Sequence, residues 1–331
     1  MADMNPITLL TGQWGDMPFE EVCKKASQMG YEGLEIGCGG DHMDVIKAAT
    51  DKNYVDQKLE ILHKYHLKSW AISTHVAGQI VGDTYDIRHN NLVPDKVKGK
   101  PDEMRAWAID QMMHTPQALK NMGCQLTTSF VGSPIWNFWY SFPQTTEAMV
   151  EDGFNRIKSL WTPIFDEFDR FDVKFALEVH PSEIAYDIYT SKKLLEVLEN
   201  RKAFGFNFDP SHLLWQGIKP HIFIRTFPEK IYHTHMKDVY ISSEDSASVI
   251  GSHLPFGDLR RKWNFRSIGR GMVDFEDIIR ELNFAGYQGP LSIEWEDSGM
   301  EREQGAKESF DFINKLRIKP SDFAFDSALK N

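Results

Sequence analysis

The chain has 331 residues, of which 41% are hydrophobic and 26% charged, a composition typical of globular proteins. The formal net charge of -11 argues against nucleic acid as a partner, because binding a phosphate backbone needs clustered lysines and arginines. Three widely spaced cysteines predict no disulfide framework and indicate a reducing, cytoplasmic setting. The N-terminal stretch lacks both a basic start and a long apolar run, so we expect neither a signal peptide nor a membrane-spanning segment.

Short apolar segments alternate with longer amphipathic stretches along the whole chain. Strands are expected at 7–12, 33–37, 68–73, 126–131, 174–179, 203–209, 230–235 and 291–295. Helices are expected near 18–29, 54–66, 102–121, 147–169, 191–199, 220–227, 274–284 and 302–315. Eight units of strand followed by helix predict an α/β protein whose parallel sheet closes into a (β/α)8 TIM barrel.

Three connections, at about 75–101, 132–146 and 236–268, are longer than plain barrel loops. Each follows a strand, so each is expected at the carboxyl end of the barrel, where barrel enzymes build their sites. Long loops in a compact domain are usually functional, and we interpret these as segments that cover a substrate, with packing or oligomer contact as the alternative. Residues 1–331 are expected to form one domain that ends in an arm after about residue 319.

Four consecutive strands carry metal-type side chains near their carboxyl ends. They contribute Glu178 in FALEVHP, Asp209 in FNFDPSH, His233 and His235 in IYHTHMKD, and Glu294 in LSIEWED. A single acid at a strand end more commonly caps a helix or joins a salt bridge, so the prediction depends on the joint pattern. Oxygen-rich sets with one imidazole suit a divalent ion, with Mn²⁺ expected first and Mg²⁺, Co²⁺ or Zn²⁺ also suitable.

Other residues near the predicted mouth are candidates for contact with a substrate. His180 follows Glu178 by two positions and keeps the same inward side if the strand persists, so it is a candidate base; the alternative is a hydrogen bond within its loop. Glu35, late in the second strand, and His75, just beyond the third, could each bind a sugar hydroxyl. Either could equally cap a helix or pair with an arginine.

Three tryptophans and two cations complete the set of candidates. Trp14, Trp136 and Trp215 could stack on the apolar face of a sugar or could instead pack in the core or anchor a loop. Arg270 stands between two glycines and could meet a charged or ring oxygen of the substrate. Lys237 is expected to pair with Asp238, or to support the metal ligands from behind.

The sequence resembles the xylose-isomerase-like barrel superfamily over about residues 5–316, in the motifs GYEGLEIG, LEVHP, NFDPSH, HMKD, GRGMVDF and IEWED. That superfamily includes sugar-phosphate isomerases and epimerases, ketose 3-epimerases, inosose dehydratases and endonuclease IV. The resemblance implies that His212 contacts the substrate and that the metal ligands are Glu178, Asp209, His235 and Glu294. Because His233 and His235 share strand parity, both could face the mouth. We choose His235, directly before Met-Lys-Asp, and expect His233 to support the ligands.

This residue set suits chemistry beside a carbonyl. Isomerisation, epimerisation and β-elimination all begin with removal of a proton next to a carbonyl, which a divalent ion polarises. A carboxylate or imidazole within reach then takes the proton. In the epimerases that the sequence resembles, a pair such as Glu178 and Glu294 works as acid and base on the two faces of the sugar. We therefore predict a metal-dependent isomerase or epimerase of keto sugars.

Other functions stay open at this point. The motifs HVAGQIVGD, FALEVHPSEIAYD, GSHLPFGDLRRKW and IEWEDSGM resemble the catalytic subunits of 3-oxo-glycoside (C-glycoside) deglycosidases. That resemblance implies a lyase reaction, enolisation followed by loss of the group at carbon one, together with a small β-rich partner subunit. A metal- or sugar-binding barrel without turnover is a further alternative. DNA repair of the endonuclease IV kind is disfavoured by the acidic chain, whereas a homo-oligomer is permitted.

Overall fold

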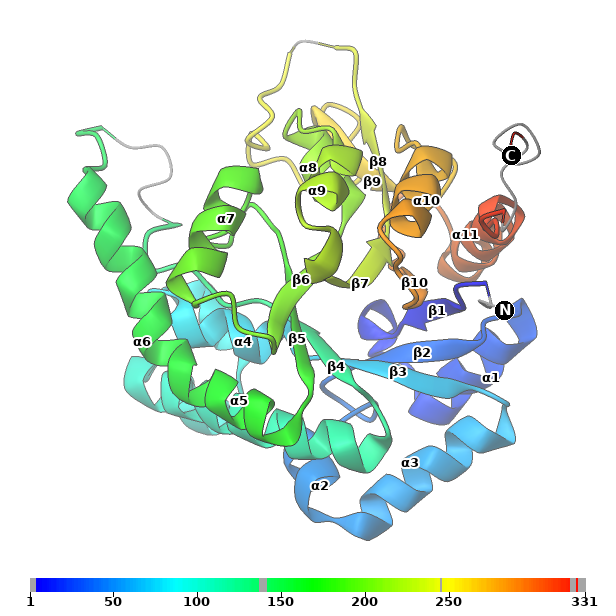
Figure 1. Cartoon of the computed structure of the whole chain (residues 1–331), viewed down its shortest axis with the longest axis horizontal. Coiled ribbons are helices and arrows are strands. Elements are labelled where there is room, and N and C mark those ends of the chain that lie inside the picture. The colour runs from blue at the N-terminus through cyan, green and yellow to red at the C-terminus, as the bar shows by residue number, and fades with distance from the viewer. Residues whose placement is uncertain (1–3, 137–141, 245, 322–325, 327–331) are drawn as a thin grey trace.

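Eight parallel strands close into a barrel surrounded by helices, which confirms the predicted (β/α)8 architecture (Figure 1). The computed structural model describes residues 4–136, 142–244, 246–321 and 326. The last barrel strand pairs in parallel with the first and so closes the ring. The barrel strands are β1 (Ile7–Leu10), β2 (Gly33–Gly37), β3 (Lys68–Ser73), β4 (Leu126–Ser129), β5 (Lys174–Glu178), β6 (Phe204–Phe208), β7 (Ile231–Met236) and β10 (Leu291–Ile293).

All eight predicted helices are present, and three short helices were not predicted. The predicted ones are α1 (Phe19–Met29), α3 (Lys52–Lys64), α5 (Pro101–Met122), α6 (Glu147–Phe171), α7 (Ile188–Val197), α9 (Pro220–Thr226), α10 (Phe275–Phe284) and α11 (Arg302–Leu316). The additional ones are α2 (Val45–Thr50), α4 (His75–Gly82) and α8 (Pro210–Trp215). Each of these has eight residues or fewer, too short for a clear periodic pattern, and α4 contains glycines, which disfavour helix.

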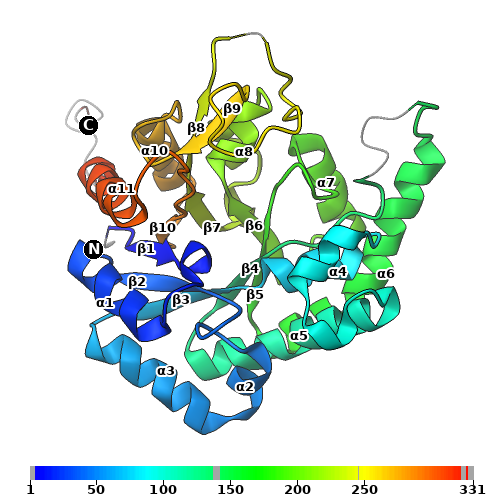
Figure 2. The ribbon, with the colours of Figure 1, turned by 180° about the vertical axis from the view of Figure 1, so that it is seen from behind.

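The long connections carry more regular structure than the sequence indicated. The first begins with α4 and continues into the short helix η2 (Ile87–Leu92). The third contains an antiparallel pair, β8 (Asp238–Ile241) and β9 (Trp263–Arg266), which stands beyond the barrel strands beside α8 (Figure 2). The second includes 137–141, which lie outside the described residues. Among the described residues, no helix is long and apolar enough to cross a membrane.

Aromatic rings fill the space between the barrel and its outer helices. Trp161 and Phe165 of α6 meet Phe175 of β5 and Phe204 of β6, with ring centroids 5.1 to 5.4 Å apart. All four side chains are fully buried. Burying each phenylalanine contributes about 1.5–3 kcal/mol of stability, so this layer holds β5 and β6 in a fixed position.

The interior of the barrel is apolar at one end and polar at the other. Ala71, Leu126 and Ala176 form a small apolar cluster. Because side chains alternate along a strand, Glu178 faces the same side as Ala176 but lies two residues nearer the carboxyl end. Buried polar groups therefore gather at the carboxyl end of the barrel, where barrel enzymes place their sites.

Gly78 allows α4 to lie against the end of β4. A methyl group at this position would collide with the carbonyl oxygen of Phe130 and the hydroxyl of Ser129. We therefore expect Gly78→Ala to lower the free energy of unfolding by about 1–3 kcal/mol, measured by urea denaturation.

Gly15→Ala is the matched control for this prediction. Gly15 has a φ of -63°. A Cβ there would meet only the Gly12 carbonyl oxygen, at 3.8 Å. Equal stability of the two variants would contradict the close approach of α4.

Candidate metal centre

The structure gathers the four residues predicted from separate strand ends at one point. Each is nearly or fully buried, with exposed fractions of 0% to 8%. One ligand atom from each lies within 4.8 Å of the others. The residues are Glu178 at the end of β5, Asp209 directly after β6, His235 in β7 and Glu294 directly after β10. β5, β6 and β10 end one or two residues earlier than predicted, because the backbone turns there into the following loops and helices, whereas β7 ends one residue later.

The donor atoms of this cluster fit a divalent cation. Asp209 Oδ2, His235 Nδ1 and Glu294 Oε2 are all buried and form no hydrogen bond of good geometry. Their close neighbours are charged groups of the same cluster, since His235 Nδ1 lies 2.9 Å from Glu294 Oε2 and 3.0 Å from Glu178 Oε2. Leaving such atoms without a well-formed hydrogen bond is costly, and a cation held between them would relieve that cost. Two glutamates, an aspartate and one imidazole are the ligand types that hard divalent ions accept.

Local structure explains why Asp209 presents a free oxygen. Its Oδ1 accepts hydrogen bonds from the Ser211 amide and hydroxyl, both at 2.7 Å, and thereby caps α8. The cap fixes the rotation of the carboxylate and turns Oδ2 toward the cluster. Asp209 therefore caps α8 and lines the centre at the same time. From the sequence, helix capping and metal binding had been alternative interpretations of such an acid.

Glu35 lies behind His235, and the prediction that it contacts substrate is wrong. It is fully buried, and its carboxylate meets Nε2 of His235 at 3.0 Å and Nε2 of His233 at 2.7 Å. The hydroxyls of Thr128 and Ser292 donate to the same carboxylate. Although burial opposes it, the neighbouring histidines hold the pKa of Glu35 well below its usual value. Glu35 thus leaves Nδ1 of His235 turned toward the cluster.

His233, expected to support the ligands, contacts the same Glu35 carboxylate that meets His235. Glu35, His233 and His235 also lie close enough together to be considered as a second ion site. Their facing atoms, however, are already joined by hydrogen bonds to one another. We interpret this group as the support of the imidazole rather than as a place for a second ion.

Two histidines predicted near the substrate contact Glu178. His75, the first residue of α4, places Nε2 at 3.1 Å from Glu178 Oε2, and its Nδ1 meets the Ser73 hydroxyl at 2.7 Å. His212 of α8 places Nε2 at 3.2 Å from Glu178 Oε1. The Glu178 carboxylate therefore has an imidazole at each oxygen.

His180 lies beside this group without contacting Glu178 through a hydrogen bond. Its Nδ1 lies 2.8 Å from the Ser182 hydroxyl. Its ring stands edge-on to the His212 ring, with the two ring centroids 4.2 Å apart. Burial and the nearby His212 lower the pKa of His180 well below its usual value. β5 ends at Glu178, so the strand parity used to place His180 does not extend to it.

Lys237 turns toward the centre instead of pairing with Asp238 as expected. Its ammonium lies 2.8 Å from Glu296 and 3.3 Å from Glu294. Asp238 instead accepts hydrogen bonds from backbone amides of the segment after β9. Burial alone would lower the pKa of Lys237, but the carboxylates of Glu294 and Glu296 raise it well above its usual value.

Sequence reasoning missed two polar residues at the centre. Glu296 pairs with Lys237, but it lies beyond the end of β10, so strand parity gave no signal for it. Gln13 donates to Glu294 at 3.0 Å and to Glu296 at 3.2 Å. No sequence pattern singles out this glutamine, because it comes from the opposite end of the chain.

Three predicted substrate contacts are placed elsewhere. Trp14 is fully buried in the core, with the Arg302 guanidinium over its ring. Trp215 stacks on Trp263 with centroids 4.4 Å apart, so one face of its ring is covered by protein. Arg270 pairs with Glu308 of α11 at 2.7 Å, and its side chain is half exposed. Trp14 therefore takes the core role that was the alternative, whereas substrate contact by Trp215 and Arg270 stays a prediction, since a ring stack and a surface ion pair already engage their side chains.

The chain belongs to the family of xylose isomerase-like TIM barrels, whose family model matches residues 23–316. Inosose dehydratase from Clostridium botulinum is 27% identical over 278 residues, which are 84% of this chain and 82% of that protein. The family assignment confirms the resemblance seen in the sequence motifs.

Solved structures share the fold at low sequence identity. The 3-keto-D-glucoside 4-epimerase YcjR from E. coli, in its apo form, superposes with a TM-score of 0.67 and 14% identity, covering 95% of this chain and 100% of that one. The IOLI protein with a bound zinc atom superposes with a TM-score of 0.63 and 14% identity, covering 94% of this chain and 97% of that one.

The centre is tested directly by metal titration. Protein stripped with a chelator and titrated calorimetrically with Mn²⁺ is expected to bind a single ion. Asp209→Asn and Glu294→Gln each remove a ligand oxygen and are expected to weaken binding by at least about 100-fold, since even supporting residues contribute about 10–100-fold. The control is Glu60→Gln, which removes an exposed charge of α3 outside the centre and should leave the affinity unchanged. Unaltered affinity in both ligand variants would show that the cluster is not the site.

Proposed function

We propose that this protein is a divalent-metal-dependent enzyme that removes a proton next to the carbonyl of a keto sugar, as an isomerase or epimerase. The observation that carries the proposal is the convergence of three buried donor atoms, none with a well-formed hydrogen bond, within a four-residue cluster at the carboxyl end of the barrel. Family members named as sugar epimerases and dehydratases support the choice of substrate class. We propose Mn²⁺ as the ion, with Mg²⁺, Co²⁺ or Zn²⁺ also suited to this donor set.

The ligand set is proposed to be Glu178, Asp209, His235 and Glu294. A divalent ion bound there would polarise the carbonyl and hydroxyl oxygens of the sugar and ease loss of the adjacent proton. Glu35 keeps the His235 imidazole in a fixed orientation for this role. Burial of the cluster excludes bulk water and strengthens each electrostatic contact within it.

Proton transfer is assigned to residues that flank the ligands. Glu178 and Glu294 come from different strands and are proposed to act as base and acid, each able to hold a proton at a carboxylate oxygen. His75 and His212 contact Glu178 and are proposed to orient it and to bind sugar hydroxyls. His180 lies against His212 and is kept as a further base.

A lyase reaction is the second candidate function. Elimination needs a group that assists the departing oxygen in addition to the base that removes the proton. Lys237 supplies a cationic donor 3.3 Å from Glu294, and relatives named inosose dehydratase are consistent with such a step. This reaction would cleave a 3-oxo-glycoside after enolisation. A small β-rich partner subunit, a homo-oligomer and a cytoplasmic location all stay predictions.

Deuterium exchange distinguishes these functions. We expect the Mn²⁺-loaded protein in D₂O to introduce deuterium beside the carbonyl of a free ketose. The incorporation of deuterium is measured by NMR or mass spectrometry. Incubation with a 3-oxo-glucoside should release the aglycone only if the lyase reaction operates. Glu178→Gln and Glu294→Gln should each lower the rate by about 100-fold or more, as removal of a general acid or base does.

Glu60→Gln is the control for these variants. Glu60 is an exposed glutamate of α3, remote in the fold from the strand ends that form the centre, so its loss should leave the rate unchanged. Full activity in both Glu178→Gln and Glu294→Gln would contradict the assignment of the centre.

A further inference from the structure

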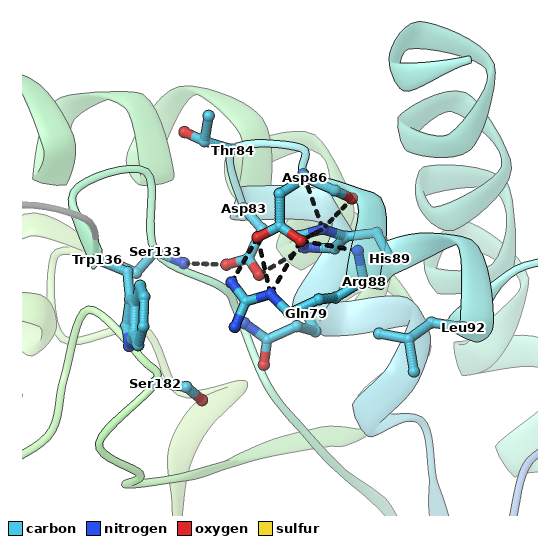
Figure 3. A pocket seen from close by; sticks show the side chains of 10 residues that line it. All are labelled: Gln79, Asp83, Thr84, Asp86, Arg88, His89, Leu92, Ser133, Trp136 and Ser182. Carbon is cyan, nitrogen blue, oxygen red and sulfur yellow. Dashed lines mark hydrogen bonds and ion pairs between the residues drawn. The ribbon is translucent and has the colours of Figure 1, made fainter. Parts of the chain in front are cut away.

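A pocket of about 250 Å³ opens between the loops that follow β3, β4 and β5. Figure 3 shows Trp136 and Ser182 on one side and His89 and Leu92 on the other, with Gln79 between them. Its size is slightly below the roughly 300–1,000 Å³ typical of pockets for drug-sized ligands, so it suits one ring rather than a large molecule.

Two chain segments connect this pocket to the centre. His75, which contacts Glu178, and Gln79, which lines the pocket, are one turn apart on the same face of α4. Ser182, also in the lining, bonds to His180 at 2.8 Å. The pocket therefore begins about one helical turn, roughly 5 Å, from the residues around Glu178.

The lining favours a neutral ligand with many hydroxyl groups. The Arg88 guanidinium is held by Asp86, with Nε at 2.9 Å from Oδ1, so it is not free to bind an anion. Asp83 accepts from the Ser133 amide at 2.7 Å and faces His89 at 3.0 Å. Two carboxylates against one guanidinium disfavour a phosphate or carboxylate ligand and provide acceptors for hydroxyl groups.

Trp136 gives the pocket an aromatic wall. The Arg88 guanidinium lies 5.4 Å from its ring, and 39% of the side chain stays exposed. An indole held in place by a neighbouring cation offers a large, rigid surface for the apolar face of a ring. Aromatic surface combined with a few polar groups is the usual composition of a small-molecule subsite.

We propose that this pocket is a second subsite, which holds a neutral hydroxylated ring attached to the keto sugar at the metal centre, as in a disaccharide. The inference rests on the proposed function, which identifies the ring at the metal centre as a keto sugar. If the second subsite exists, a glycoside with two rings binds more tightly than the free monosaccharide.

Calorimetric titration of the full-length, Mn²⁺-loaded protein tests this subsite through binding alone. The two probes are a 3-keto-disaccharide of two glucose rings and 3-ketoglucose. We expect the disaccharide to bind at least about tenfold more tightly. Trp136→Ala should lose most of this difference in affinity between the disaccharide and 3-ketoglucose. Trp136→Phe should retain most of it, because an aromatic ring is still present. Phe142→Ala, which removes an aromatic side chain that is 97% exposed in the same connection, should leave the ratio unchanged.

Three outcomes would overturn the subsite. They are equal affinity of the protein for the two probes, no binding of either probe, and an equal loss of affinity for both probes in Trp136→Ala. Deuterium exchange on the same samples separates this outcome from failure of the proposed function. Tighter binding of the disaccharide without any exchange would keep the subsite and remove the proposed chemistry. Exchange without a preference for the disaccharide would keep the chemistry and remove the subsite.

Discussion

The contact between the Glu35 carboxylate and the His235 imidazole organises the carboxyl end of this barrel. An imidazole has two nitrogens, and only one of them can face a metal ion while the other is held. Glu35 occupies Nε2 from inside the barrel, so Nδ1 is left facing Glu178, Asp209 and Glu294. Removal of Glu35 would leave the ring free to turn and the cluster without its only nitrogen donor.

The energetic cost of this arrangement points to a bound cation. The carboxylates of Glu35, Glu178, Asp209 and Glu294 are all withdrawn from water within one region of the barrel. Lys237 and the surrounding histidines offset part of the repulsion, but three donor atoms of the cluster still lack a well-formed hydrogen bond. Burying charge without compensation is expensive, and a divalent ion is the compensation that best matches these ligand types. The fold thus supports a centre that would be unfavourable if nothing were bound there.

The sequence was sufficient for the architecture and for the four-residue cluster, for a physical reason. Carboxyl ends of consecutive parallel strands meet at one end of a barrel, so residues far apart in the sequence can be placed together from strand position alone. Strand parity placed His233 and His235 on the same side of β7. It could not say how far below the mouth of the barrel each side chain lies. That position decides that Glu35 lies behind the His235 ring and does not reach the mouth. Parity could not have placed Glu296, because β10 ends at Ile293.

Residues outside the strands were predicted less well, because their environment depends on tertiary packing. Trp14 and Arg270 have side chains suited to sugar binding, yet one is covered by the core and the other meets Glu308 on the surface. The helix that carries His75 was missed because its glycines, including Gly78, disfavour helix locally and are required only by the neighbouring strand end. The glycines of α4 thus disfavour a helix locally, although the packing of α4 against the end of β4 requires them.

Anomalous scattering from crystals of the Mn²⁺-loaded protein tests the central claim most directly. The account predicts one strong manganese peak bounded by Glu178, Asp209, Glu294 and Nδ1 of His235, with Glu35 still bonded to Nε2 of the same ring. A peak among Glu35, His233 and His235, or no manganese at the four-residue cluster, would contradict it.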